Sequence, residues 1–106
     1  MKVLFICNQN ENRSRTAEEV FREQFKTMSA GLYNDNPVNE QQLGWADVII
    51  VMEESQRKEL ASRFPKQYMK KRILSLNIPD VYYYNQPELI DELKTKMSKL
   101  VEPLIK

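Results

Sequence analysis

The chain's single cysteine is followed, after five residues, by an arginine and a serine, in the order Cys7, Arg13, Ser14. A loop of this length can turn its backbone N–H groups toward one tetrahedral oxyanion, and a helix that begins there adds donors and the positive end of its dipole. Cys7 would lie under such an anion as a thiolate nucleophile, while the planar fork of Arg13 can bind two anion oxygens. The spacing therefore predicts covalent phosphoryl chemistry without a metal.

Residues on either side of this loop predict the elements that must position it. An apolar run over 3–6 precedes Cys7 and reads as a buried strand. A helix is predicted over 17–28, because one helical face of that segment is apolar. The residues on this face are Ala17, Val20, Phe21, Phe25 and Met28.

Strand and helix patterns alternate along the rest of the chain. We expect a short strand or turn at 29–32, a strand at 47–52, a helix over 54–64 stopped by Pro65, a strand at 72–76, and a helix from Pro87 that Pro103 ends. The basic segment 66–72 reads as a solvated connection. This alternation predicts an α/β fold, a three-layer α/β/α arrangement with a four-stranded parallel sheet. Such sheets bind ligands beyond the carboxyl ends of their strands, where Cys7, Glu53 and Asp80 fall.

Length and composition narrow the functions further. The 106 residues suffice for one domain, 1–106, with one core. A net charge of +1 gives no reason to expect a nucleic acid or a membrane as partner, and oligomeric state is not predicted. One cysteine and no histidine leave no zinc constellation, so we expect no metal and no cofactor. The first apolar stretch is too short for a signal peptide, which favours a cytoplasmic location.

The loop between Cys7 and Arg13 contains no glycine. An anion-binding loop needs residues near left-handed φ and ψ, and asparagine tolerates that region, so Asn8, Asn10 and Asn12 can take the place of glycine. Glu11 would oppose a dianion unless its side chain points to solvent, and we expect it to point outward. A polar surface turn is the alternative interpretation.

A leaving group that departs from phosphate needs a proton, and in a chain without histidine the donor must be Asp, Glu or Tyr. Asp80 is the candidate, because it follows a strand and precedes three tyrosines, 82–84, that can wall a slot for a phenyl ring. An exposed turn residue is the alternative role for Asp80.

Several segments resemble the low-molecular-weight protein tyrosine phosphatases. The similarity covers 3–7, Asn10, Arg13, Ser14, Ala17, Glu18, 29–31, 46–55 and 79–83. It is greatest to a compact bacterial branch of predicted phosphatases, in which Ile-Pro-Asp precedes Pro-Glu-Leu-Ile, as 78–80 precedes 87–90 here.

This resemblance implies the fold of that family and a protein tyrosine phosphatase that works through a phosphocysteine on Cys7. It makes Arg13 the phosphate clamp and Asp80 the general acid and then base. Ser14 would stabilise the thiolate. The substrate would be a phosphotyrosine-bearing protein or a small aryl phosphate.

The resemblance also implies a set of substrate-binding residues. Tyr82 and Tyr83 would flank the substrate ring, and Asn10 would be the left-handed residue that shapes the loop. The remaining loop residues of the expected site are Asn8, Gln9, Glu11 and Asn12.

Departures from the family pattern leave other functions open. Gln9 replaces a loop glycine, Asn12 replaces a second loop cysteine, and Arg15 and Val81 replace prolines. The segment between 31 and 46 is also shorter than in the larger relatives. The alternatives are a non-catalytic phosphate-binding or regulatory module and a phosphocysteine carrier domain. An arsenate reductase would need further cysteines.

Overall fold

Strands and helices alternate along residues 1–105, which the computed structural model describes; residue 106, the last of the expected domain, lies outside them. The elements are β1 (Lys2–Cys7), α1 (Arg13–Phe21), β2 (Lys26–Gly31), α2 (Glu40–Trp45), β3 (Val48–Val51), α3 (Glu54–Arg63), α4 (Pro65–Lys70), β4 (Arg72–Ser75), α5 (Pro87–Lys96), the π-helical turn η1 (Met97–Val101) and α6 (Glu102–Ile105). No helix within this part of the chain is long and apolar enough to cross a membrane.

The four strands form one parallel sheet in the order β2-β1-β3-β4. Cys7, the last residue of β1, lies beside Gly31 of β2, and Ile6 lies beside Val51 of β3. The predicted parallel sheet is therefore confirmed. Because all strands run the same way, their carboxyl ends meet at one edge, and Cys7 lies there.

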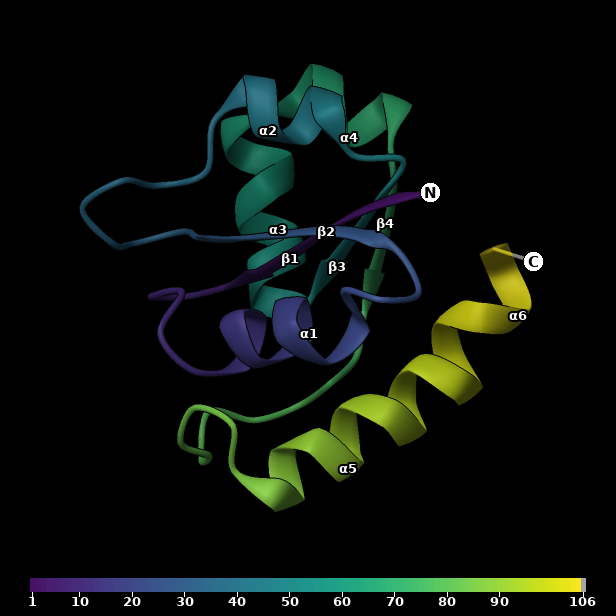
Figure 1. The fold of residues 1–106 in the computed structure, drawn as a ribbon. Helices are drawn as coiled ribbons and strands as arrows, with labels where there is room; N and C mark the ends of the chain where they lie inside the picture. The colour runs from purple at the N-terminus through teal and green to yellow at the C-terminus, as the bar shows by residue number, and fades with distance from the viewer. Residues whose placement is uncertain (106) are drawn as a thin grey trace.

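Helices cover both faces of the sheet (Figure 1). Val3 and Phe5 of β1 pack with residues of α1 and α5, and Phe5 stacks on Phe21 with ring centroids 5.8 Å apart. Leu4 and Ile6 point to the opposite face, where residues of α2 and α3 complete a second buried cluster. Alternate residues of β1, which is buried from Val3 to Cys7, thus belong to two cores, and this gives the predicted three layers.

The helix predicted over 17–28 is wrong in both of its bounds. Helix α1 begins at Arg13 and ends at Phe21, whose carbonyl accepts from the N–H groups of Gln24 and Phe25, both at 3.1 Å. The chain then turns into β2, which starts at Lys26 rather than at 29. Phe25 and Met28 pack on opposite sides of the sheet because they belong to the turn and the strand. Pairing with β1 outweighs the apolar periodicity.

Two short helices were not predicted. Helix α2 begins with a capping box between Asn39 and Gln42, and α4 lies in the basic segment that we expected to be a connection. Pro65 occupies the first position of α4, where a missing N–H costs no hydrogen bond. It therefore separates two helices instead of ending the helical region.

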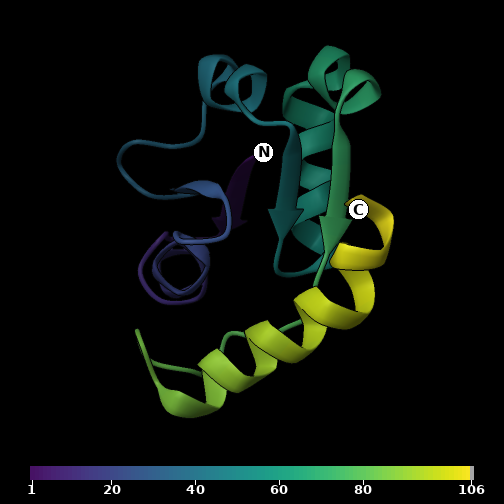
Figure 2. The same ribbon diagram turned by 45° about the vertical axis from the view of Figure 1, so that its right-hand side comes forward.

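The carboxyl-terminal helix passes through Pro103 instead of ending there, and α5 runs into α6 without a break (Figure 2). The turn η1 makes this continuation possible, because the N–H of Glu102 donates to the carbonyl of Met97, five residues back. This wider turn places Pro103 near the start of α6, where neither its missing N–H nor its ring interrupts a hydrogen bond of the helix.

Candidate active site

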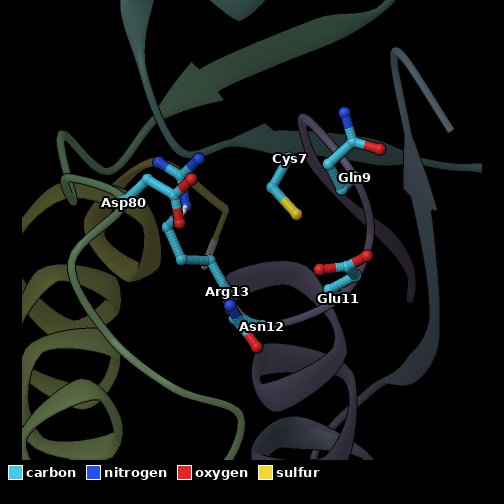
Figure 3. Close-up of a pocket in the computed structure, with 6 residues that line it drawn as sticks. All are labelled: Cys7, Gln9, Glu11, Asn12, Arg13 and Asp80. Atoms are coloured by element: carbon cyan, nitrogen blue, oxygen red, sulfur yellow. Dashed lines mark ion pairs between the residues drawn. The ribbon is translucent and has the colours of Figure 1, made fainter.

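A small pocket opens beyond the carboxyl end of β1. The residues that line it are Cys7, Gln9, Glu11, Asn12, Arg13 and Asp80. Figure 3 shows Arg13 and Asp80 on one side of the Cys7 sulfur, with Gln9 and Glu11 on the other. The pocket therefore combines residues of the β1–α1 loop and the start of α1 with Asp80 of the loop after β4. Asp80 lies 67 residues after Arg13 in the sequence.

Cys7 is buried at the base of this pocket, and its Sγ lies 2.9 Å from Oγ of Ser14. The Ser14 hydroxyl donates to Oδ1 of Asn10 at 2.7 Å, so in this arrangement the Cys7 thiol is the donor to Ser14. A rotation of the Ser14 hydroxyl away from Asn10 would aim it at the sulfur. Ser14 thus lies where one hydroxyl rotation turns it into a donor to a thiolate.

The loop after Cys7 bends at Asn10, whose φ of 56° is left-handed, as expected. Asn8 and Asn12 do not adopt this conformation, so Asn10 alone takes the place of glycine. No backbone N–H of residues 9–12 donates to another backbone group in the described chain. These N–H groups, together with those of the first turn of α1, are free to bind an anion.

The end of β2 holds the beginning of this loop. The carbonyl of Asn8 accepts from the N–H groups of Leu32 and Tyr33, each at 2.9 Å. A Cβ on Gly31 would lie 3.0 Å from that carbonyl oxygen and 2.6 Å from Oδ1 of Asn34. The close approach of the two segments therefore favours glycine at position 31, because a larger residue would displace the Asn34 side chain and crowd the Asn8 carbonyl.

Arg13 is almost completely buried, with 1% of its surface exposed. Both hydrogens of its Nη1 are used, because this atom donates to Oε1 of Glu53 at 2.9 Å and to the carbonyl of Ile78 at 2.8 Å. The opposite edge of the guanidinium, formed by Nε and Nη2, remains for a ligand. Two parallel N–H groups on that edge match two oxygens of a phosphate.

The loop that carries Asp80 is fixed on both sides. Before it, the N–H of Ile78 donates to the carbonyl of Met52 at 2.8 Å; after it, the N–H of Asn85 donates to Oγ1 of Thr16 at 2.9 Å. The Asp80 side chain is 60% exposed, and its Oδ1 lies 3.8 Å from Nε of Arg13. The carboxyl group thus lies at the mouth of the pocket, beside the free guanidinium edge.

The structure does not bring Tyr82 and Tyr83 to the pocket. Tyr82 is partly buried against the core cluster that contains Phe5, and Tyr83 is 80% exposed. The chain bends sharply where the N–H of Val81 donates to the carbonyl of Pro79, and this bend separates the tyrosines from Asp80. Tyr84 instead contacts Arg15, whose Cζ lies 5.2 Å from the centroid of the Tyr84 ring. The aromatic slot expected for a phenyl ring is absent from the residues that line the pocket.

Glu11 also differs from the expectation. We expected its side chain to point away from the concave face, but Glu11 lines the pocket together with Cys7 (Figure 3). It stays exposed, and its carboxylate makes no hydrogen bond or ion pair with any described residue.

Sequence reasoning missed Gln56, a buried residue behind the site. Its Oε1 accepts from the N–H groups of Met52 and Glu53 at 2.7 and 3.0 Å, and its Nε2 donates to Oδ1 of Asn8 at 3.1 Å. Gln56 therefore joins the start of α3 to the Cys7 loop. Its signal was the spacing of Glu53 and Gln56, a capping box at the start of a helix.

The sheet order, the helices on both faces and the loop that follows β1 together define a known architecture. The chain has the fold of the low-molecular-weight protein tyrosine phosphatases.

Three solved structures illustrate the likeness. The low-molecular-weight protein tyrosine phosphatase from T. tengcongensis matches with a TM-score of 0.75 and 24% identity over 98% of this chain and 99% of its own. The tyrosine phosphatase AmsI from Erwinia amylovora matches with a TM-score of 0.78 and 18% identity, over 99% of this chain and 93% of its own. The YwlE arginine phosphatase from Geobacillus stearothermophilus matches with a TM-score of 0.73 and 18% identity, over 92% of this chain and 88% of its own. The chain matches no protein-family model and no curated protein sequence.

Proposed function

We propose that this protein is a cysteine-dependent phosphatase that moves a phosphoryl group first to Cys7 and then to water. The observation that supports it is the set of unused donors around one sulfur. The backbone N–H groups of residues 9–12 make no backbone hydrogen bond in the described chain, and Nη2 of Arg13 makes none either. Gln9, Glu11, Asn12 and Arg13 line the pocket that holds Cys7.

The first step forms a bond between the sulfur of Cys7 and phosphorus while the bond from phosphorus to the leaving group breaks. The loop N–H groups and Arg13 bind the phosphoryl oxygens as charge develops on them. Asp80, at the mouth, gives its proton to the leaving atom.

In the second step, the resulting Asp80 carboxylate takes a proton from a water molecule, which attacks phosphorus. The bond between sulfur and phosphorus breaks, and Cys7 returns as a thiolate that the Ser14 hydroxyl can stabilise. Because this cycle needs a reduced thiol, a reducing compartment such as the cytoplasm suits the protein.

The resemblance in sequence supports a phosphotyrosine-bearing protein or a small aryl phosphate as substrate. AmsI and the T. tengcongensis protein, both tyrosine phosphatases, have the same fold. The arginine phosphatase YwlE has it as well, so this fold accommodates more than one kind of leaving group. The choice among substrates therefore depends on the rim of the pocket.

The test is the turnover of p-nitrophenyl phosphate by the wild type and by Cys7→Ser. We expect the wild type to release phosphate and the variant to lose turnover while still binding inorganic phosphate or vanadate. Phosphate binding by the wild type without turnover would indicate a binding module. A stable phosphocysteine without phosphate release would indicate a carrier domain. Near wild-type turnover by Cys7→Ser would exclude the mechanism.

A further inference from the structure

The hydroxyl of Thr16, a fully buried residue of α1, makes two hydrogen bonds to two different loops. It donates to the carbonyl of Asn12 at 2.7 Å and accepts from the N–H of Asn85 at 2.9 Å. A threonine in a helix commonly donates to the carbonyl four residues back, and that bond alone reaches no other segment. The donor at Asn85, however, lies 69 residues away in the sequence. One oxygen atom therefore joins the β1–α1 loop to the β4–α5 loop, which carries Asp80.

The two hydrogen bonds of this hydroxyl differ in what their loss would do. The carbonyl of Asn12 also accepts from the backbone N–H of Thr16 at 2.9 Å, so it keeps a donor when the hydroxyl is removed. The N–H of Asn85 has no other acceptor among residues 1–105. Removal of the hydroxyl should therefore loosen the β4–α5 loop and leave the β1–α1 loop in place.

Asn85 belongs to a turn that two further hydrogen bonds close. The N–H of Gln86 donates to the carbonyl of Tyr83 at 3.2 Å, and the N–H of Tyr83 donates to Oε1 of Gln86 at 2.8 Å. Tyr84 of the same turn contacts Arg15, whose Cζ lies 5.2 Å from the centroid of the tyrosine ring. Two consecutive residues of α1 thus hold two consecutive residues of this turn, where the chain passes below α1 in the view of Figure 1.

The position of Asp80 depends on this turn, because few other contacts fix it. Its side chain is 60% exposed, makes no hydrogen bond with residues 1–105, and has one ion pair, which spans 3.8 Å. On the carboxyl side of Asp80, Tyr82 packs against the core. The bond from Asn85 to Thr16 is the one hydrogen bond in the described chain that joins this side of the loop to α1 or to the sheet.

We propose that Thr16 is a positioning residue of this phosphatase, whose hydroxyl, through Asn85, holds the Asp80 carboxyl where it can give its proton to the leaving atom. This inference rests on the proposed function, because Thr16 acts only through Asp80, the proposed acid. The donors follow one another in one direction, from the N–H of Asn85 through the hydroxyl to the carbonyl of Asn12, and such chains strengthen their members. Asn12 lines the pocket, so the acid is held relative to the place where phosphate binds.

The experiment uses variants that separate the hydroxyl of Thr16 from its shape. Thr16→Val removes the hydroxyl and keeps the branched side chain, whereas Thr16→Ser keeps the hydroxyl. Thr27→Val is the matched control, because Thr27 also donates to a backbone carbonyl of α1, that of Glu18 at 3.0 Å, but makes no hydrogen bond to either loop. Each variant is assayed with phenyl phosphate and p-nitrophenyl phosphate against a Cys7→Ser blank. Inorganic phosphate serves as competitive inhibitor, and circular dichroism verifies that each variant is folded.

We expect Thr16→Val to lower kcat for phenyl phosphate by about tenfold or more and kcat for p-nitrophenyl phosphate much less, because the poorer leaving group needs the proton of Asp80. The inhibition constant of phosphate should stay close to the wild-type value. Thr16→Ser should keep most of the wild-type rate on both esters, and Thr27→Val should match the wild type. Amide hydrogen exchange at Asn85, followed by NMR, should be faster in Thr16→Val than in Thr16→Ser.

A second variant tests the same turn from the surface. Arg15→Ala removes the contact with Tyr84 at an exposed position, so it gives an answer even if Thr16→Val does not fold. It should also slow phenyl phosphate more than p-nitrophenyl phosphate, although by a smaller factor than Thr16→Val.

An equal loss on both esters in these variants would overturn the inference, because a general structural defect slows the two reactions alike. A wild-type rate of Thr16→Val on phenyl phosphate would overturn it as well and leave the proposed phosphatase in place. Turnover of p-nitrophenyl phosphate alone by the wild type would have the same meaning, since no proton transfer from Asp80 would then be at work. If the wild type hydrolyses neither ester above the Cys7→Ser blank, the proposed function fails and this inference with it.

Discussion

Arg13 and Glu53 lie 40 residues apart in the sequence, yet Nη1 of Arg13 donates a hydrogen bond to Oε1 of Glu53 at 2.9 Å. The guanidinium is buried, whereas the Glu53 side chain is 34% exposed. With the carbonyl of Ile78 as second acceptor, this pair holds one edge of the guanidinium and leaves the other edge to face the pocket. Glu53 therefore positions the Arg13 guanidinium, the proposed phosphate clamp, and is not among the residues that line the pocket.

Replacing Glu53 by alanine should disturb the orientation of Arg13. We expect kcat/KM for p-nitrophenyl phosphate to fall by about 10- to 100-fold, because small displacements of a binding group cost that much. Glu53→Gln keeps an acceptor oxygen and should lose less. The adjacent Glu54→Ala removes only a surface ion pair with Arg57 and is the control. Equal activity of Glu53→Ala and Glu54→Ala would show that Glu53 has no positioning role.

Asp80 should matter in proportion to the need of the leaving group for a proton. Asp80→Asn should slow phenyl phosphate hydrolysis by roughly 10² to 10⁴-fold, and the activated p-nitrophenyl ester much less. Asp91→Asn, an exposed carboxylate on α5, should leave both rates unchanged. The measurement is kcat for the two esters at one pH. An equal loss on both esters would assign the proton transfer to another group.

Gln56 should support both the fold and the loop. Gln56→Met keeps the approximate volume but removes the acceptor for one buried and one partly buried N–H group, those of Met52 and Glu53, and the donor to Asn8. We expect the free energy of unfolding to drop by about 2 kcal/mol or more, as measured by urea denaturation. Asn8→Ala, which removes only the last contact, should cost less stability. An unchanged denaturation midpoint in Gln56→Met would contradict this account.

Oxidation of Cys7 should pass beyond the sulfenic acid. The sequence contains no second cysteine, so the oxidised sulfur has no intramolecular thiol to form a disulfide with. After peroxide, mass spectrometry should show added oxygen atoms, and dithiothreitol should restore little activity. Inorganic phosphate in the pocket should slow the oxidation. Full recovery of activity by the reductant would argue against this course.

Local features of the sequence were sufficient to predict the strand that ends at Cys7, the loop after it, the presence of a helix after the loop, and the parallel sheet, although not the bounds of that helix. An apolar run, a fixed spacing and alternating periodicities act over a few residues and need no distant partner. The tolerance of asparagine for left-handed backbone predicted such residues at Asn8, Asn10 and Asn12 alike, and only Asn10, which the family resemblance had singled out, adopts this conformation.

Only the tertiary structure decided where α1 ends, which partners hold Arg13, and which side chains form the rim of the pocket. Strand β2 begins at Lys26 because the chain pairs with β1 from that residue on, although the apolar pattern had predicted a helix as far as residue 28. Glu53 and Gln56 contact the loop across 40 and 48 residues, a relationship that no local pattern encodes. The positions of Glu11 and Tyr83 relative to the pocket depend on how two loops bend, because side-chain direction follows the backbone of a loop and not its composition.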